Sequence, residues 1–394
     1  MKKILVINAG SSSLKFQLIA MPEREVLASG LVDRIGQETS TYSFLTTDIK
    51  IEESEIIPDH EYAMALVAEQ LLDPIYGVID TPSQIDTVSH RVVHGGSIFK
   101  EPTLINETVK EKIKELFSLA PLHNPANLTG IEVSEQIFPD AIQIAVFDTA
   151  FHQTIPEHAF RYAIPNELYE QHQIRVYGFH GTSHKYVSKK AIEYLENPEA
   201  KLVVLHLGNG CSATAIVNGE SVDHSLGFGP VPGLIMGTRS GDIDPAAVLY
   251  LIDKLGYSAE EVNHILNKKS GLLGLTGHSD LREIQKGVSN GDAACILALE
   301  MTAYRIRKYI GAYTAAMNGI DALVFTAGIG ENSALLREKV CENLDFLGIC
   351  INNDKNENTE KGIREIQNGY TKILVIPTNE ELEIAIQSYE LMEA

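Results

Sequence analysis

The sequence predicts an α/β protein built from two domains. Strand-like and helix-like segments alternate along the whole chain, which is typical of sheets covered by helices. The 394 residues exceed what one hydrophobic core usually serves. A unit of apolar strand, polar turn and second strand occurs twice, at residues 3–19 and again at 202–217. The two copies suggest an internal duplication, although no linker rich in Gly, Ser or Pro marks where one half ends.

Each expected strand is a short apolar run, and each expected helix has apolar residues at helical spacing. Strands are expected at residues 3–7, 14–19, 85–93, 142–147, 201–206, 211–217, 322–326 and 372–376. Residues 25–32 could add a third strand to the first copy, and the hairpin signal Asn218-Gly219 predicts one for the second. Helices are expected at residues 61–72, 109–119, 246–255, 294–317 and 380–392.

The composition excludes several classes of partner. There are 32 Lys and Arg against 53 Asp and Glu, and the formal net charge of −21 repels nucleic acid and anionic membranes at long range. We therefore expect no nucleic-acid partner, no membrane partner, and a local cluster of donors for any anionic ligand. The first residues lack the apolar core of a signal peptide, and the four cysteines fit neither a metal site nor a disulfide framework. A cytoplasmic location is expected.

The first polar turn, NAGSSSLK at residues 8–15, could cradle phosphate, because glycine lets the backbone approach and successive N–H groups can converge on an anion. It is not a Walker A loop, since Leu14 and not glycine precedes Lys15. A plain polar hairpin is the alternative. A third glycine cluster, residues 327–333, is expected to be a turn between the strand 322–326 and a helix at 334–344. A helix N-terminus of this kind suits a phosphate or a sugar.

Nine motifs together resemble the acetate kinases, the acetokinase family. They occur in the family's order and are spread over almost the whole chain: NAGSSSLKF at 8–16, HRVVHGG at 90–96, HNPAN at 123–127, FDTAFHQTIP at 147–156, YGFHGTSH at 177–184, HLGNG at 206–210, MGTRSGDIDP at 236–245, GIGEN at 328–332 and PTNEELEIA at 377–385.

The resemblance implies a fold and an assembly. The fold would be two ribonuclease-H-like domains of the kind shared by acetate and sugar kinases, Hsp70 and actin, with the active site in the interdomain cleft. Residues 1–150 would form the N-terminal domain together with the C-terminal helix at about 381–394, and residues 151–380 the nucleotide-binding domain. The family also implies a homodimer.

The implied reaction is the reversible conversion of ATP and acetate to ADP and acetyl phosphate, with Mg²⁺, for which Mn²⁺ could substitute. Phosphoryl transfer needs positioning and charge stabilisation more than a strong base.

Four residues match the family's catalytic positions. Arg91 would hold the substrate carboxylate, where a surface salt bridge is the alternative. Arg239 would neutralise the transferring phosphoryl group, where pairing with Asp242 or Asp244 is the alternative. His180 would hydrogen-bond that group. Asp148 is often regarded as a proton donor or acceptor, but a carboxylate substrate is already ionised at neutral pH, so we expect Asp148 to orient Arg91 or magnesium-bound water; a strand-end cap is the alternative.

The two histidine pairs spaced by four residues, His180 with His184 and His90 with His94, lack the neighbours of a transition-metal site. His123 matches a family position near the active site without a defined role.

Asn8 and Glu380 match the magnesium positions, and one amide oxygen and one carboxylate suffice for an ion that keeps several waters. Glu380 also reads as an acidic residue in the first turn of a helix capped by Thr378 or Asn379. The nucleotide positions would be Lys15, His206, Leu207, Gly208, Asn209, Gly210, Asp280, Leu281, Arg282, Gly328, Ile329, Gly330, Glu331 and Asn332.

An apolar pocket of Val93, Leu122, Phe179 and Pro230 would set substrate size. One methylene is worth only about 1–3 kcal/mol in such a pocket, so propionate is an expected second substrate. Two departures stand out. Pro232, in Gly229-Pro-Val-Pro-Gly233, replaces the family's glutamate, and Cys211 replaces a glycine or alanine.

Two other functions remain open. One is a kinase that prefers propionate or butyrate, and the other is a non-enzymatic ATP-binding protein of the same superfamily, a chaperone or filament former. The presence of Arg91, His180 and Arg239 favours chemistry.

Overall fold

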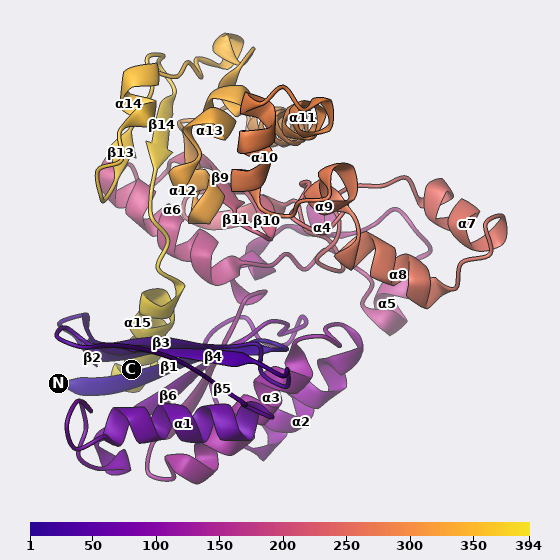
Figure 1. The fold of residues 1–394 in the computed structure, drawn as a ribbon. Helices are drawn as coiled ribbons and strands as arrows, with labels where there is room; N and C mark the ends of the chain where they lie inside the picture. The colour runs from indigo at the N-terminus through magenta and orange to yellow at the C-terminus, as the bar shows by residue number, and fades with distance from the viewer. The chain divides into compact units, whose positions relative to one another are not determined.

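The computed structural model describes residues 1–394, and the chain separates into two compact units. Unit 1 comprises Met1–Phe151 and Asn379–Ala394, and unit 2 comprises His152–Thr378. Figure 1 shows the elements of both, coloured along the chain. No helix is long and apolar enough to cross a membrane.

Unit 1 is built on an eight-stranded mixed sheet with the strand order β5-β4-β3-β2-β1-β6-β8-β7. Its elements are β1 (Lys2–Ala9), β2 (Ser13–Met21), β3 (Glu25–Asp33), β4 (Ser40–Leu45), β5 (Lys50–Glu55), α1 (His60–Leu72), the 3₁₀ helix η1 (Pro82–Gln84), β6 (Thr87–Val92), β7 (Thr103–Leu104), α2 (Glu107–Glu115), η2 (Leu116–Ser118), α3 (Asn124–Ile137), β8 (Ile142–Phe147) and α15 (Glu380–Glu393).

The alternation of side chains along β1 explains how helices cover both faces of this sheet. Leu5 and Ile7 belong to the core cluster that contains residues of α1 and α3. Ile4 and Val6 belong to a second cluster, which contains Ile384 of α15. In Figure 1, α1 and α15 accordingly lie on opposite faces of the sheet. The C-terminal helix is therefore an integral part of unit 1.

Unit 2 is built on a six-stranded sheet with the order β11-β10-β9-β12-β14-β13. After η3 (Ala150–Thr154), its elements are α4 (Glu157–Phe160), α5 (Asn166–His172), α6 (Gly181–Leu195), β9 (Lys201–Leu207), β10 (Cys211–Val217), β11 (Glu220–His224), α7 (Pro245–Asp253), α8 (Ala259–Lys268), α9 (Gly271–Thr276), α10 (Leu281–Ser289), α11 (Ala293–Ala316), β12 (Ala322–Thr326), α12 (Ala327–Asn332), α13 (Ala334–Cys341), η4 (Asp345–Leu347), α14 (Asn353–Glu357), β13 (Arg364–Glu365) and β14 (Lys372–Val375).

The two sheets share one central topology. In unit 1, β1 pairs antiparallel with β2 and parallel with β6, and β6 pairs parallel with β8. In unit 2, β9 pairs antiparallel with β10 and parallel with β12, and β12 pairs parallel with β14. The third strand of each unit pairs antiparallel with the second. The predicted α/β class and the duplicated strand-turn-strand unit are confirmed.

One predicted segment is wrong. Residues 327–333 were expected to be a glycine turn, but Ala327–Asn332 forms the helix α12 directly after β12. Ser333 then caps α13, where its side chain accepts a hydrogen bond from Leu336 N. The expected helix at 334–344 ends at Cys341, since Asn343 adopts a left-handed φ of 62°.

Candidate active site

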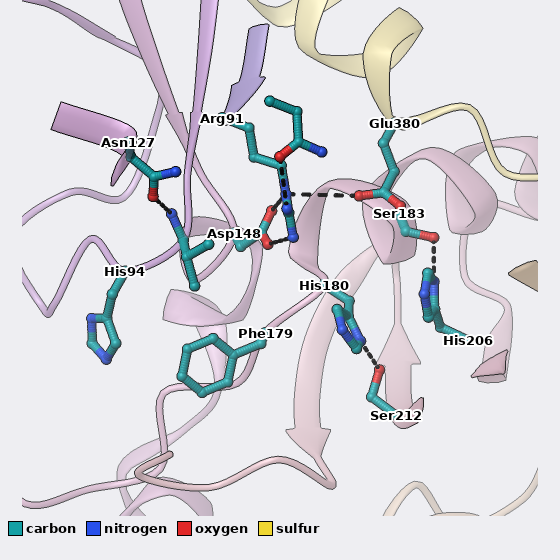
Figure 2. A network of polar contacts seen from close by, with 12 residues as sticks. Arg91, His94, Asn127, Asp148, Phe179, His180, Ser183, His206, Ser212 and Glu380 are labelled. Atoms are coloured by element: carbon teal, nitrogen blue, oxygen red, sulfur yellow. Dashed lines mark hydrogen bonds and ion pairs between the residues drawn. The ribbon is translucent and has the colours of Figure 1, made fainter. Parts of the chain in front are cut away.

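Three predicted residues of unit 1 meet at one edge of its sheet. Asn8 lies near the carboxyl end of β1, Arg91 lies in β6, and Asp148 directly follows β8. The three strands are parallel neighbours, so their carboxyl ends lie at the same edge, where α/β proteins commonly bind ligands. Figure 2 shows Arg91 between Asp148 and Glu380.

Arg91 is fixed by two neighbours. Its Nε donates to Asp148 Oδ1 at 3.0 Å, its Nη2 donates to Asp148 Oδ2 in a short contact, and its Nη1 donates to Asn8 Oδ1 at 3.1 Å. Burial lowers the pKa of Arg91, but Asp148 and Glu380 outweigh burial, so the net pKa is raised and the guanidinium is charged. A guanidinium has five N–H donors. Three are engaged, which leaves one donor on each terminal nitrogen.

Glu380 is the first residue of α15, which Asn379 caps by accepting from Leu382 N. One of the two predicted caps is therefore confirmed. Glu380 Oε2 lies 3.9 Å from Arg91 Nε, and its side chain is 23% exposed. Burial raises the pKa of Glu380 to about 7, against the opposing effect of Arg91. The next residue, Glu381, pairs with Lys15 at 2.6 Å.

The charges at this edge suit an added cation. Three carboxylates, Asp148, Glu380 and Glu381, are opposed by two cations, Arg91 and Lys15, so one negative charge is left over when all are ionised. No group of three or more His, Cys, Asp or Glu side chains is arranged to hold a metal ion by itself. The donor set therefore fits an ion that takes most of its ligands from water and phosphate, as Mg²⁺ does.

Two asparagines of α3 hold the strand ends in place, and sequence reasoning assigned them no role. Asn127 Oδ1 accepts from Val93 N at 3.0 Å, the bond marked by the dashed line at Asn127 in Figure 2, and Asn127 Nδ2 donates to Ala9 O at 2.6 Å. Asn124 accepts from His94 N and donates to His94 O, each at 3.0 Å. The motif HNPAN contained the signal, because polar residues that recur at helical spacing on a buried helix face need partners.

The other predicted site residues of unit 1 are Val93, Leu122, His123 and Lys15. Val93 is half-buried, and Leu122, in the turn before α3, is 51% exposed. His123 stands at the N-cap position of α3 but makes no side-chain cap. Lys15 lies opposite Asn8 in the β1–β2 ladder, so the two side chains share one face of the sheet.

In unit 2, three predicted segments converge on the turn at residues 206–210. Gly237 N donates to Asn209 O at 3.0 Å. A Cβ placed on Gly237 would clash with Asn209 and stand 3.1 Å from Ser279 O, next to Asp280. A Cβ placed on Gly208 would stand 3.9 Å from the Cβ of Ala327, which begins α12. The structure thus brings together residues 206–210, 236–239, 279–282 and 327–332.

His180 and Arg239 both approach Gly210. A Cβ on that glycine would stand 3.3 Å from His180 Nε2 and 3.7 Å from Arg239 Nη1. His180 has a left-handed φ of 56° at the N-cap position of α6, and its Nδ1 hydrogen-bonds Ser212 Oγ at 3.0 Å, as Figure 2 shows.

Arg239 has no carboxylate partner. Its Nη1 donates to Pro230 O at 3.2 Å and approaches the sulfur of Met236, and burial lowers its pKa. The alternative pairing with Asp242 or Asp244 does not occur: Asp242 accepts from Gly233 N and Tyr309, and Asp244 caps α7. A half-buried cation without an acidic partner suits an anionic ligand.

The other predicted nucleotide residues have clear local roles. Asp280 caps α10 and pairs with the exposed Arg282, whose hydrogen bonds hold the pKa of Asp280 at about 2. Leu281 is buried. His206 Nδ1 hydrogen-bonds Ser183 Oγ at 2.8 Å.

Beneath α12 lies Arg337, which the sequence did not single out. It is 1% exposed and donates to Gly330 O and Glu331 O, each at 2.9 Å. Asn332 Nδ2 donates to Gly328 O at 2.8 Å, and Glu331 Oε1 accepts from Thr378 N at 3.1 Å. These bonds explain how a glycine-rich stretch remains helical.

Phe179 and Pro230, the predicted pocket residues of unit 2, are respectively 3% exposed and half-buried. The loop that contains Pro232 ends at Gly233, whose N donates to Asp242 Oδ1 at 2.7 Å.

The unusual Cys211 is buried, its thiol approaches Gly208 O at 3.2 Å, and burial raises its pKa to about 12. This thiol therefore fills space in the turn and stays protonated.

Comparison with known proteins decides the family. The family model described as the acetokinase family matches residues 3–386. The protein belongs to the acetokinase family. An acetate kinase from Flavobacterium johnsoniae is 58% identical over 393 residues, which cover 99% of this chain and 100% of that protein. An acetate kinase from Thermotoga maritima is 51% identical over 398 residues, with 99% of each chain covered.

Solved structures of this family share the whole architecture. The crystal structure of Porphyromonas gingivalis acetate kinase is similar with a TM-score of 0.93 and 44% identity, and each chain is covered completely. A propionate kinase from Francisella tularensis has the same TM-score, at 45% identity, with 98% of this chain and 99% of that chain covered. The resemblance seen in the motifs is confirmed, and the acetokinase fold extends over both units.

Proposed function

We propose that the protein is an acetate kinase that transfers the γ-phosphoryl group of ATP reversibly to acetate. Membership of the acetokinase family supports this, as does the state of Arg91, which carries the proposal. Asp148 and Asn8 occupy three of its donors and fix its plane, and one donor on each terminal nitrogen remains for a substrate carboxylate.

In the proposed reaction, an oxygen of the bound carboxylate attacks the γ-phosphorus. A bond forms between this carboxylate oxygen and the γ-phosphorus. The bond between the γ-phosphorus and the β,γ-bridging oxygen breaks, and ADP leaves with its electron pair. The carboxylate is already ionised near neutral pH, so no general base is needed. Asp148 therefore acts by orienting Arg91, and its 1% exposure suits a positioning role.

Charge on the transferring phosphoryl group would be stabilised by three cationic or donor side chains. Arg239 lacks a carboxylate partner, and His180 Nε2 faces the same glycine of the 206–210 turn. Lys15 would add charge toward the ATP phosphates. Such positioned donors supply most of the catalysis expected for phosphoryl transfer.

Asn8 and Glu380 would hold Mg²⁺, with Mn²⁺ as a substitute. When bound, the ion would neutralise phosphate charge. The adenosine part of ATP would lie against residues 280–282 and 328–332, and its phosphates against residues 206–210. These assignments rest on the family motifs and on the convergence of these segments within unit 2.

Acid preference is the least constrained part of the proposal, because relatives named acetate kinase and propionate kinase are both highly similar to this chain. Val93, Leu122, Phe179 and Pro230 would limit the acyl chain. The deciding measurement is kcat/KM for acetate, propionate and butyrate with ATP and Mg²⁺, with the acyl phosphate trapped as hydroxamate. We expect acetate to be preferred. A clear preference for butyrate would reassign the substrate, and absence of acid-dependent ADP formation would overturn the proposal.

Arg91→Lys and Arg239→Lys test the two arginines while each keeps its charge. We expect kcat/KM for acetate to fall about a hundredfold in each, because a lysine cannot form a planar fork. Arg91→Lys is preferable to Arg91→Ala, since alanine would remove both hydrogen bonds that Arg91 donates to the buried Asp148 carboxylate together with their positive charge. Near-wild-type kcat/KM in either variant would exclude the corresponding role.

We further propose that the protein acts as a homodimer, as its family membership implies. Light scattering after size-exclusion chromatography should give twice the 43.3 kDa chain mass. A monomeric mass in the active protein would contradict this.

A further inference from the structure

Two buried side chains, Ser212 and His184, are hydrogen-bonded in series to the half-buried His180 within unit 2. Ser212, on β10, is 0% exposed, and its Oγ lies 3.0 Å from His180 Nδ1 and 2.7 Å from His184 Nε2. His184, on α6, is also 0% exposed, and its other ring nitrogen, Nδ1, has no hydrogen-bond partner. One serine hydroxyl thus bridges the rings of two histidines.

The position of each proton follows from counting donors. A serine hydroxyl donates once, so Ser212 can donate to only one of the two rings. If it donates to His184, the proton of that neutral ring must sit on Nδ1, where a buried N–H finds no acceptor. If both rings donate to Ser212, the buried hydroxyl proton has no acceptor. In the remaining arrangement, His184 Nε2–H donates to Ser212, and the Ser212 hydroxyl donates to His180 Nδ1. Only this arrangement gives both protons, that of the His184 ring and that of the Ser212 hydroxyl, an acceptor.

An orphaned buried N–H is rarer and costlier than an unused acceptor lone pair, which decides between these arrangements. This placement of the protons holds for a neutral His184. Burial lowers the pKa of His184 well below its ordinary value, and the neighbouring His152 and His206 lower it further. His184 therefore has one ring proton, and the hydrogen bonds run in one direction, from His184 through Ser212 to His180.

We propose that Ser212, oriented by His184, holds His180 as the neutral tautomer that carries its proton on Nε2. Ser212 and His184 are positioning residues, since they act through His180. Nε2 is the nitrogen that approaches Gly210 in the 206–210 turn. If the proposed function is correct, His180 then donates a hydrogen bond to the transferring phosphoryl group and keeps its proton throughout the reaction.

The tautomer can be measured without any activity. In protein labelled with ¹⁵N in its histidine rings, long-range ¹H–¹⁵N correlation identifies which nitrogen of each ring carries the proton. The His180 signals are assigned from their loss in His180→Gln. We expect wild-type His180 to show a protonated Nε2 and an unprotonated Nδ1, and Ser212→Ala to show exchange between the two tautomers.

Ser221→Ala is a matched control. Ser221 is likewise 0% exposed, and its hydroxyl hydrogen-bonds Nδ1 of a buried histidine, His152, at 2.8 Å. Ser212→Ala loses two serine–histidine bonds and Ser221→Ala loses one, so we expect both melting temperatures to fall, and that of Ser212→Ala to fall further. Only Ser212→Ala should change the His180 ring signals. A proton on His180 Nδ1 in the wild type, or identical His180 signals in Ser212→Ala, would overturn the proposal.

Kinetics provide a second readout. We expect Ser212→Ala to lower kcat about tenfold, the effect of losing one hydrogen bond that orients a donor, with KM for ATP and acetate nearly unchanged. Ser212→Cys, whose thiol is a weak donor of similar size, should restore part of kcat. A raised KM with unchanged kcat would contradict a role through His180. Failure of the proposed function would show differently, as a wild-type protein without acetate-dependent ADP formation.

Discussion

Glu380 is a residue whose ionised side chain lowers the free energy of unfolding when no cation is bound. Its carboxylate lies with those of Asp148 and Glu381, and three negative charges are here paired with two positive ones, those of Arg91 and Lys15. A bound cation would supply the missing positive charge. Without that cation, ionised Glu380 costs free energy, since burial raises its pKa from the ordinary 4.5 to about 7.

The sign of the resulting pH dependence follows from proton binding. Between pH 4.5 and about 7, folded Glu380 binds a proton that the unfolded chain has already released. The free energy of unfolding therefore falls as the pH rises through this window, by roughly 3 kcal/mol in total at about 1.4 kcal/mol per pKa unit.

Glu380→Gln should remove this loss. Without divalent metal, we expect the variant to match the wild type near pH 4.5 and to melt at a higher temperature above about pH 7, while losing kinase activity. Scanning calorimetry of both proteins across this range tests the prediction. A difference in melting temperature that does not change with pH would show that Glu380 does not titrate in this way.

A role could be predicted from the sequence for residues that lie in a family motif and whose side-chain partner lies in another such motif. The interpretation of Asp148 as the residue that orients Arg91 agrees with their paired hydrogen bonds. Ser212 could not be found, because its role depends on a contact between strand β10 and helix α6 that no spacing in the sequence encodes. Asn127 was part of a quoted motif, but its partners, Val93 N and Ala9 O, are backbone atoms.

At the scale of elements, α3 acts as a clamp on the strand ends of unit 1. Asn127→Ala would leave Val93 N and Ala9 O without their bonds in a buried site, at a cost of roughly 2–4 kcal/mol. We expect KM for acetate to rise as well, because Asn127 would no longer hold Val93 or Ala9, and Ala9 is the neighbour of the Asn8 that binds Arg91.

Thr129→Ala on the same helix is the control for Asn127→Ala. Thr129 is exposed and bonds only Pro125 O of its own helix, so the change should stay within about 0.5 kcal/mol. Urea unfolding and acetate titration compare the two variants. An Asn127→Ala protein as stable as Thr129→Ala would show that α3 does not clamp these strands.

The turn at residues 206–210 is a second element whose geometry leaves little room. A Cβ on Gly210 would stand 3.3 Å from His180 Nε2, closer than ordinary van der Waals contact, so the imidazole must move. We expect Gly210→Ala to fold and to lose about tenfold or more in kcat.

Gly311→Ala, within α11, is the matched control, because nothing lies within 4 Å of a Cβ there. This change should raise the free energy of unfolding by up to about 1 kcal/mol, because alanine favours a helix more than glycine does. Steady-state kinetics and melting temperatures test both changes. Wild-type kcat in Gly210→Ala would mean that His180 tolerates displacement.

Elements with strong periodic patterns were predictable, and those stabilised by remote contacts were not. The strands β8, β10 and β12 match their predicted bounds, since each is a short run rich in apolar residues. Helix α12 was missed because glycines disfavour helices. Arg337, from the following helix, binds its carbonyl groups and stabilises it. The short strand β13, Arg364–Glu365, has no apolar pattern and exists only through its pairing with β14.

At the scale of the whole molecule, the net charge of −21 opposes the approach of an anionic nucleotide, whereas Arg239, His180 and Lys15 would attract it locally. Long-range repulsion acts over the Debye length, about 30 Å at 10 mM salt and about 8 Å at 150 mM. Local contacts form within a few ångströms and are screened less. Added salt should therefore weaken the repulsion more than the attraction.

We expect the association rate of MgATP to rise several-fold as ionic strength increases from about 10 mM to about 150 mM, the opposite of electrostatically steered binding. Stopped-flow measurements with a fluorescent ATP analogue give this rate directly. Potassium chloride and potassium glutamate at equal ionic strength should give the same increase, because screening depends on ionic strength and not on the anion. A rate that falls with salt would mean that local cations dominate the encounter, and the overall charge would then not govern nucleotide capture.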